Sequence, residues 1–474
     1  MNHSVRWAEY GEYDVPRETP SRRLSFFKFI LRYPIFILAS GPPIFRVAHD
    51  KIDATKGILD VWSFVQVSVL LIITLRAIWR LSNARSILTP KKIRSILLLA
   101  SFLGVLYTIS VFYSTSRRVS LAYSIIYFLT LICVFEFILD VYRTPPNWLQ
   151  CLFHLRLIAI LVLLLVLVVL FINPTLVVGT LPGEEIERFS GGAVGSMLLI
   201  CPLISIISAY AFLNSLESKV KSTFLFFVGL VGVVLARSRG CELALLLVFA
   251  ILAFRWAKMG QRVAYVVISG FMNFVLLVGI FVTFVGGGTI WNFFNRGQDI
   301  KGIESASGRT DIWKFVFQYC FVHPWGMGYV AGFRMLFRNY YALGLEINVV
   351  GIGNAHNSFL QVLADAGWLA LAIYLIMLVK IVRLALRFAK KPAYMQFARD
   401  NEFRMALECS LVLLVFFFAE GQDTSLFTVP LKPEFYMQFI IIAIILGISA
   451  KLIADFRARH VVAAGRFSGG RDVG

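Results

Sequence analysis

The chain contains a series of apolar runs of about 18–25 residues, the length that an α-helix needs to cross a bilayer. The runs are continuously apolar rather than alternating, which favours helices over the strands of a membrane barrel. Of the 474 residues, 58% are hydrophobic and 15% are charged, and the mean hydropathy is +0.77. One soluble core could not bury that much apolar surface. The sequence therefore predicts an all-α polytopic membrane protein.

The predicted membrane spans number about eleven or twelve by the length criterion. They cover residues 57–79, 94–114, 119–142, 149–172, 191–213, 222–236, 242–256, 263–284, 357–386, 404–419 and 434–455. Residues 25–47 are also apolar, but Lys28, Arg32, Pro34 and the Gly41-Pro42-Pro43 break make them either a poor span or a re-entrant or interfacial segment. Spans with short connections therefore fill residues 25–284 and 357–456, and a large loop separates the two regions.

The net charge of +19 is concentrated in short connections between apolar runs, where basic residues set orientation. Four such connections lie near residues 76–94, 219–221, 255–262 and 380–404. Alternating spans place all four on one side, which the positive-inside rule makes the cytoplasm. The basic tail, residues 457–474, then also lies in the cytoplasm. Residues 1–24 are a cytoplasmic or flexible basic N-terminus, and residues 285–356 form a large periplasmic loop.

The periplasmic loop is predicted to be partly helical. A helical pattern runs from about Ser307 through Cys320, and His323-Pro324-Trp325-Gly326-Met327-Gly328 ends it. His323 suits that turn better than it suits catalysis. Arg334 and Arg338 follow at a spacing that puts both on one helical face, where a solvated face is the alternative to ligand binding.

Several arginines fall on the external side, against the positive-inside trend. Arg237 and Arg239 share one short external connection, and Arg117 and Arg118 occupy another. An anionic ligand would explain them, whereas the alternative is that their long side chains simply reach the interface.

His356 stands where the polar loop gives way to the apolar run that ends near Leu386. An imidazole at a membrane boundary, with an unperturbed pKa near ~6.5, can take a proton from a hydroxyl at neutral pH. The alternative is that His356 caps the helix beginning there. The six cysteines are scattered without a CxxC pair, so neither a disulfide framework nor a metal site is expected.

Four elements together resemble the superfamily of O-antigen ligases and of O-antigen or exopolysaccharide polymerases. They are Arg239-Gly240-Cys241-Glu242-Leu243; Arg309 with Trp313; the His323–Gly328 turn; and His356-Asn357 followed after nine residues by Gly367. In that superfamily an R-x-x-x-L element and an H-[NSQ]-x9-G-x-x-G element border a large periplasmic loop. The sequence departs from the pattern at Ala370, where the final glycine would stand. We expect this difference to alter helix packing rather than chemistry.

The resemblance implies an inverting, metal-independent glycosyltransferase of the bacterial inner membrane, with no cofactor and with its active site on the periplasmic face. It would move a glycan from undecaprenyl pyrophosphate to an acceptor hydroxyl on another glycan or on lipid A–core. His356 is then the base, and Arg239 and Arg309 bind the pyrophosphate. The predicted substrate-binding residues are Arg237, Asn357, Arg334, Arg338 and Trp313. The lipid bilayer is the other partner, a chain-length regulator is left open, and no nucleic acid is expected.

Several alternatives remain. The imperfect final glycine and a loose resemblance to that branch favour a polymerase over a ligase. A polysaccharide-related transporter would use ionisable groups inside apolar runs, such as His154, Arg156 and Glu136. A polyprenyl-phosphate-sugar transferase would use an acidic base in an early external loop, with Asp50, Asp53 and Asp60 as candidates. Further side chains that could contact sugars are Glu420, Asp423, Tyr340, Tyr341 and Trp325.

Overall fold

The computed structural model shows a helical bundle. It describes residues 25–39, 61–83, 90–143, 148–179, 188–189, 197–236, 238–258, 309–332, 355, 357–390, 401–420 and 433–468. The predicted span at residues 263–284 lies outside these residues, as do most of the predicted loop and both chain ends.

The described helices precede and follow the predicted loop. Those before it are α1 (Phe26–Arg32), α2 (Ile35–Ala39), α4 (Val61–Ser82), α5 (Lys91–Ile109), η1 (Ser110–Phe112), α6 (Arg117–Arg143), α7 (Trp148–Ile172), η2 (Pro174–Leu176), α8 (Met197–Leu213), α9 (Lys219–Ala236) and α10 (Arg239–Lys258). Those within or after it are α14 (Arg309–Val322), α16 (Ser358–Lys390), α18 (Asn401–Glu420) and α19 (Pro433–Ser468). The strands β1 (Val178–Gly179) and β2 (Arg188–Phe189) pair antiparallel between α7 and α8.

Seven of the described helices are long and apolar enough to cross a membrane, namely α4, α5, α6, α7, α9, α16 and α19. Shorter apolar helices occur within α8, α10 and α14. The long helices also have apolar side chains on their outward faces, as Leu164 and Phe171 of α7 and Leu369 of α16 illustrate. A lipid-facing surface explains these exposed groups, and the all-α polytopic membrane fold is confirmed.

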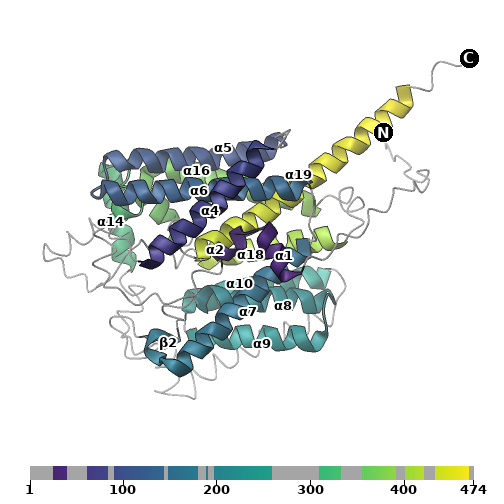
Figure 1. Ribbon diagram of the computed structural model, residues 1–474, viewed down its shortest axis with the longest axis horizontal. Coiled ribbons are helices and arrows are strands. Elements are labelled where there is room, and N and C mark those ends of the chain that lie inside the picture. The colour runs from purple at the N-terminus through teal and green to yellow at the C-terminus, as the bar shows by residue number, and fades with distance from the viewer. Residues whose placement is uncertain are drawn as a thin grey trace, which may run out of the picture.

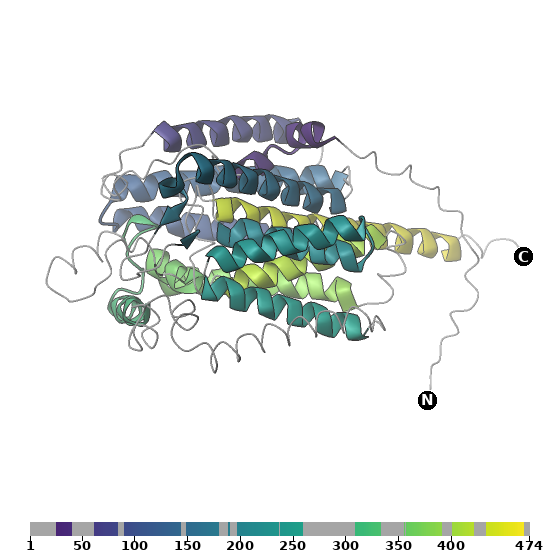
Figure 2. The ribbon, with the colours of Figure 1, turned by 90° about the horizontal axis from the view of Figure 1, so that it is seen from below.

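The helices form two groups joined by a central pair (Figures 1 and 2). One group contains α4, α5, α6 and α16, and the other contains α7, α8, α9 and α10. Of the central pair, α18 packs against members of both groups, and α19 packs against α18 and against α6 and α16 of the first group. The helix α14 lies at one end of the bundle, and the C-terminal part of α19 extends from the opposite end.

Residues 25–39 form two short helices rather than one long one. The break falls at Tyr33-Pro34, and Pro34 cannot continue a regular helix because it lacks a backbone N–H. Phe29 and Phe36 are fully buried, and the ring of Phe29 lies 4.3 Å from that of His154. This segment is therefore packed into the bundle by its aromatic face.

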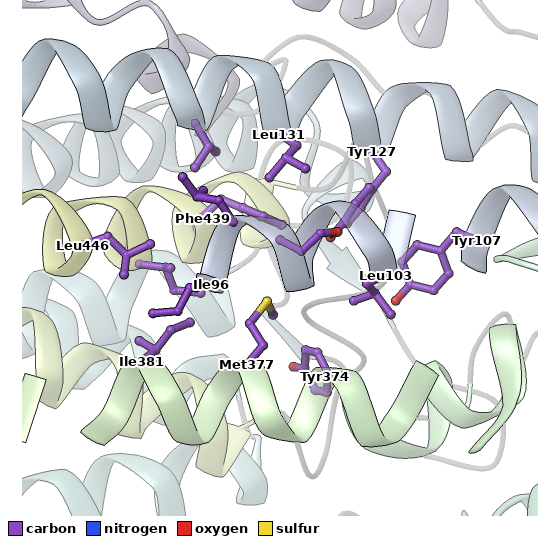
Figure 3. Close-up of a pocket in the computed structure, with 14 residues that line it drawn as sticks. Ile96, Leu103, Tyr107, Tyr127, Leu131, Tyr374, Met377, Ile381, Phe439 and Leu446 are labelled. Atoms are coloured by element: carbon purple, nitrogen blue, oxygen red, sulfur yellow. The ribbon is translucent and has the colours of Figure 1, made fainter. Parts of the chain in front are cut away.

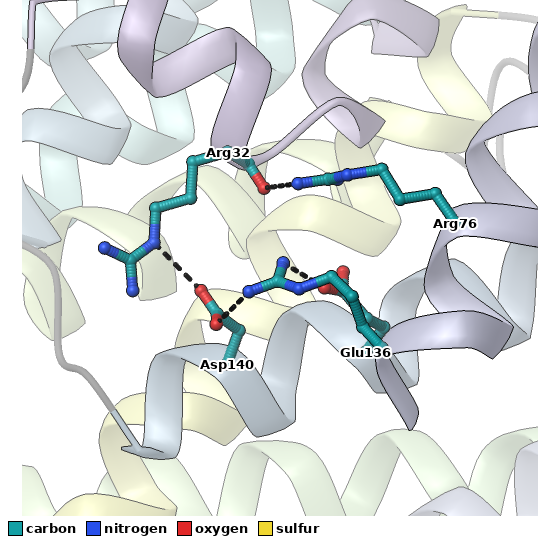
Figure 4. A network of polar contacts seen from close by, with 5 residues as sticks. Arg32, Arg76, Glu136 and Asp140 are labelled. Carbon is teal, nitrogen blue, oxygen red and sulfur yellow. Dashed lines mark hydrogen bonds and ion pairs between the residues drawn. The ribbon is translucent and has the colours of Figure 1, made fainter. Parts of the chain in front are cut away.

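An ion-pair network joins this segment to the ends of α4 and α6 (Figure 4). Arg80 pairs with Glu136 and, at 2.6 Å, with Asp140, whose other oxygen accepts a hydrogen bond of 3.1 Å from Arg32. The guanidinium of Arg76 donates to the backbone oxygen of Arg32 at 3.1 Å. Charges paired in this way are far less costly to bury than single charges.

A second buried cation is paired at the same end. Arg156 donates to both carboxylate oxygens of Glu217 at 2.7 and 2.6 Å, and Glu217 lies in the turn between α8 and α9. Lys221 approaches the same carboxylate at 3.2 Å. These contacts gather basic residues at the bundle end where α6 finishes and α9 begins.

Candidate functional site

Three helices that begin at or directly after predicted site residues start at one end of the bundle. They are α10, which starts at Arg239, α14, which starts at Arg309, and α16, which starts at Ser358. Successive helices alternate in direction, so the starts of α6, α8 and α10 share an end. Figure 1 places α14 and β2, just before α8, at that same end. We call the bundle end at which α10, α14 and α16 begin the motif end. The ion-pair networks of Arg80 and Arg156 lie at the opposite end of the bundle.

Ala355, the residue directly before His356, is held by two hydrogen bonds. Its N–H donates to Oε1 of Gln361 at 2.7 Å, and its carbonyl oxygen accepts from the indole Nε1 of Trp313 at 3.0 Å. Trp313 stands one helical turn after Arg309 on α14. The structure therefore brings the start of α14 against the chain that leads into His356.

Asn357, the residue directly after His356, caps α16. Its Oδ1 accepts hydrogen bonds from the N–H groups of Phe359 at 2.9 Å and Leu360 at 3.1 Å. These donors have no partner within the helix, and an asparagine is among the best residues to satisfy them. Asn357 therefore occupies the N-cap position of α16.

Asp365 joins α16 to the turn that follows α14. Its Oδ1 accepts from Nε2 of Gln361 at 2.8 Å and from the N–H of Val330 at 3.0 Å. Asp365 is fully buried, and Gln361 is 1% exposed. Both side chains are therefore committed to backbone and side-chain partners inside the protein.

Gly367, the glycine of the predicted histidine motif, interrupts α16. Its φ of 79° lies in the left-handed region, and a Cβ there would overlap the carbonyl oxygen of Pro324. The N–H of Trp368 instead donates to that oxygen at 3.1 Å. A glycine is needed because the turn after α14 lies directly against this break.

The turn after α14 is held against α16 by hydrogen bonds between their backbones. Met327 donates to the carbonyl oxygen of Ala364 at 2.6 Å, and Gly328 donates to that of Asp365 at 3.1 Å. Gly326 and Gly328 have φ values of 88° and 107°, as a turn this tight requires. The prediction that the His323–Gly328 stretch ends the helix is confirmed, since α14 stops at Val322. His323 is exposed, and its ring lies 4.5 Å from that of Tyr319 in a tilted arrangement.

The same turn also docks on the first half of the chain. The N–H of Tyr329 donates to Oγ of Ser110 at 2.8 Å, and its carbonyl oxygen accepts from Oγ of Ser120 at 2.8 Å. Its ring stacks on Tyr107 with centroids 3.8 Å apart. The turn is therefore fixed between the start of α6 and the break in α16.

Residues 224–375 match a family model described as O-antigen ligase. This segment belongs to the O-antigen ligase family. The match runs from α9 to the middle of α16 and includes each element on which the resemblance was based. A search of curated proteins gave no match. The chain is thus a multi-pass membrane protein that is similar, over this segment, to O-antigen ligases.

The arginines of the O-antigen ligase segment are placed by their helices. Arg239 and Arg309 are the first residues of α10 and α14. Several predicted site residues, His356, Arg237, Arg334 and Arg338, lie outside the described residues, together with Asp50, Asp53, Asp60, Tyr340, Tyr341 and Asp423. Their roles stay predictions.

The R-x-x-x-L element of the O-antigen ligase segment packs against the end of α18. Cys241 is fully buried and its thiol donates to the carbonyl oxygen of Leu198 at 3.5 Å, and its helix, α10, packs against α18. Glu420, the last residue of α18, is 2% exposed. Leu243, by contrast, is 66% exposed and faces outward. The end of α18 thus places one buried carboxyl, that of Glu420, at the motif end.

A cavity of about 30 Å³ lies in the bundle between α5, α6, α16 and α19 (Figure 3). Tyr107, Tyr127 and Tyr374 line one part of it, and Leu446 and Ile381 line another. It contains no charged side chain, so it is not a place where a pyrophosphate could bind.

Gln361 and Asp365 were not among the predicted site residues. Their signal was nevertheless in the sequence, because an aspartate inside an apolar run is costly and commonly functional. The i,i+4 spacing also puts both side chains on one helical face. Ser110 and Ser120 carried no comparable signal, since a serine is common within membrane helices.

Proposed function

We propose that the protein is a periplasm-facing glycosyltransferase that moves a glycan from undecaprenyl pyrophosphate to an acceptor hydroxyl. The observation that carries the proposal is the meeting of Trp313 with Ala355 at the motif end of the O-antigen ligase segment. This contact joins the helix that Arg309 starts to the chain that enters His356.

The orientation of the motif end is supported by the distribution of basic residues. Arg80, Lys219 and Lys221 lie at the opposite end, with the networks around Glu136 and Glu217. Basic residues near span ends favour the cytoplasmic side. On this basis the motif end faces the periplasm.

The positions of the two arginines support an anionic ligand. A helix start carries a partial positive charge, so a cation there typically costs about 0.3–1 kcal/mol of helix stability. Arg239 and Arg309 both occupy such starts. A pyrophosphate would be bound jointly by the guanidinium groups and the helix starts. Its negative charge would offset the repulsion between each arginine and the positive end of its helix.

The chemistry follows from these roles. His356 removes the proton from an acceptor hydroxyl, and the resulting oxygen attacks the anomeric carbon of the donor sugar. The bond from that carbon to the pyrophosphate oxygen breaks, and Arg239 and Arg309 stabilise the charge that develops on the leaving group. One displacement inverts the anomeric centre. The polyprenyl tail stays in the bilayer throughout.

Polymerase action is our first choice within this class, and ligase action on lipid A–core is the second. Deletion of the protein from its native strain distinguishes them. A polymerase mutant accumulates single lipid-linked repeats, whereas a ligase mutant accumulates long lipid-linked chains. Normal polymer in the deletion strain would contradict both.

Transport is less well supported. Glu136 and Arg156 are paired with Arg80 and Glu217 near one end of the bundle, rather than facing each other at its middle. His154 packs against the ring of Phe29. Ion pairs at a membrane boundary suit anchoring of the bundle better than alternating access.

Substitution separates our proposal from the acidic-base transferase. His356→Ala should abolish polymer in cells, and Asp60→Asn should leave it unchanged. The reverse pattern would favour the acidic-base mechanism. His323→Ala is the matched control, because His323 is an exposed histidine of the turn close to the same helix.

A further inference from the structure

We infer that Gln361 and Asp365 are positioning residues, which fix the backbone at Ala355 and thereby the place of the His356 imidazole. The inference deepens the proposed function and rests on it. Neither side chain is assigned a contact with substrate.

The first step is the contact of Gln361 with the chain before His356. Its Oε1 accepts the N–H of Ala355 at 2.7 Å, and its Nε2 donates to Asp365 at 2.8 Å. An amide side chain whose oxygen and nitrogen are both engaged has one orientation. Gln361 therefore sets a fixed distance between α16 and the segment that enters His356.

The second step is the anchoring of Gln361 by Asp365. Oδ1 of Asp365, which accepts the hydrogen bond from Nε2 of Gln361, also accepts one from the N–H of Val330 at 3.0 Å. Val330 adopts a φ of 59°, unusual for a β-branched residue. The aspartate thus links three segments: α16, the turn after α14, and, through Gln361, the residue before His356.

The third step is the cost of this arrangement. A carboxylate that is fully buried in a membrane helix is expensive, and well-packed apolar residues commonly give equal or greater stability. The network is therefore poorly explained by stability alone. A general base must lie within hydrogen-bond reach of its proton, and a displacement of about 1 Å can cost about a hundredfold in rate. Precise placement of the chain before His356 meets that need.

The test compares purified full-length Gln361→Met and Gln361→Glu proteins with the wild type. Methionine has a similar volume but cannot accept the N–H of Ala355, whereas glutamate can, with one proton shared between its carboxyl and Asp365. Two quantities are measured: hydrogen–deuterium exchange of the peptide that contains Ala355, and kcat and KM with a lipid-linked oligosaccharide. Exchange is independent of catalysis.

We expect Gln361→Met to speed exchange at Ala355 by about fivefold or more. Its kcat should fall by at least about tenfold while the KM for the donor changes little. Gln361→Glu should restore protection and most of the turnover. The control is Glu136→Gln, which replaces the charged partner of Arg80 with a neutral amide. Glu136 lies about 24 Å along α6 from Ser120, whose hydroxyl donates to the carbonyl oxygen of Tyr329. It should lower the melting temperature without a selective loss of kcat.

Unchanged exchange and unchanged kcat in Gln361→Met would overturn the inference. So would a loss of kcat that tracks the melting temperature equally in Gln361→Met and Glu136→Gln. The proposed function is tested separately with the His356→Ala protein. Full turnover of that protein in the same assay would show that His356 is not the base. The exchange data would then still decide whether Gln361 holds the segment.

Discussion

The indole nitrogen of Trp313 donates a 3.0 Å hydrogen bond to the carbonyl oxygen of Ala355, the residue directly before His356. This contact joins the first turn of α14, which begins at Arg309, to the chain that enters α16. It therefore connects the segments that carry two proposed roles: Arg309, which binds the pyrophosphate, and His356, which is the base. The backbone directly before the predicted base is thus held against the helix that begins at the predicted pyrophosphate-binding arginine.

Trp313→Phe should reduce turnover while leaving the fold intact. Phenylalanine keeps a ring in the half-buried site but loses the N–H donor, which costs the folded state about 1 kcal/mol. Thermal unfolding and glycan transfer by the purified protein measure the two effects. Trp79→Phe is the matched control, because the side chain of Trp79 is 67% exposed on α4 and has no proposed contact with substrate. Equal turnover in both variants would contradict the positioning role of Trp313.

Gly367→Ala should destabilise the protein by more than about 2 kcal/mol, because φ is positive and the new Cβ would meet the Pro324 carbonyl. Urea or thermal unfolding in detergent measures the loss. The expected consequence is separation of the turn from α16, and hence loss of turnover. A Gly367→Ala protein with wild-type stability would show that the break in α16 is not required.

Ala370→Gly restores the glycine that the superfamily pattern would have at this position. Ala370 is fully buried in the regular helix after the break. Glycine inside a helix costs about 1 kcal/mol relative to alanine, so a small fall in melting temperature is expected. Turnover and product length should be unchanged. A change in product length would show that position 370 affects chemistry rather than packing.

The ion pair of Arg156 with Glu217 should make stability depend on acid pH. Burial alone would raise the pKa of Glu217, but its hydrogen bond with Arg156 and the nearby cations outweigh it and lower the pKa overall. A carboxyl with a depressed pKa in the folded state stabilises it above the unfolded pKa, and this contribution is lost as pH falls through the folded value. The melting temperature of wild type should therefore fall more steeply below about pH 4.3, the ordinary glutamate pKa, than that of Glu217→Gln. Parallel curves would contradict this assignment.

The membrane helices could be predicted closely because the bilayer imposes one length and one polarity. The predicted span at residues 149–172 corresponds to α7 (Trp148–Ile172), and that at residues 119–142 corresponds to α6 (Arg117–Arg143). The largest difference in length is at α19, where the prediction ended at residue 455 and the helix continues to Ser468. Hydrophobicity marks where a helix leaves the membrane, but it does not mark where the helix ends.

The site was predictable only in part, because motifs identify residues and not their partners. Asn357 was predicted to bind substrate, and its Oδ1 caps α16. The network of Gln361 and Asp365 depends on the backbone of Ala355 and Val330, which no sequence pattern brings together. Residues 25–47 showed the same limit: the break at Pro34 and the contact of Arg32 with Asp140 are seen only in the structure, and residues 40–47 lie outside the described residues.

The most direct measurement of the central claim is glycan transfer by purified protein from a lipid-linked oligosaccharide. Wild type, His356→Ala, Arg309→Ala and the control His323→Ala would be compared in one assay. We predict that His356→Ala and Arg309→Ala each lose at least about a hundredfold in turnover, as is usual for a general base or a group that stabilises developing charge. His323→Ala should remain close to wild type. Full turnover by the combined His356→Ala and Arg309→Ala protein would contradict the account.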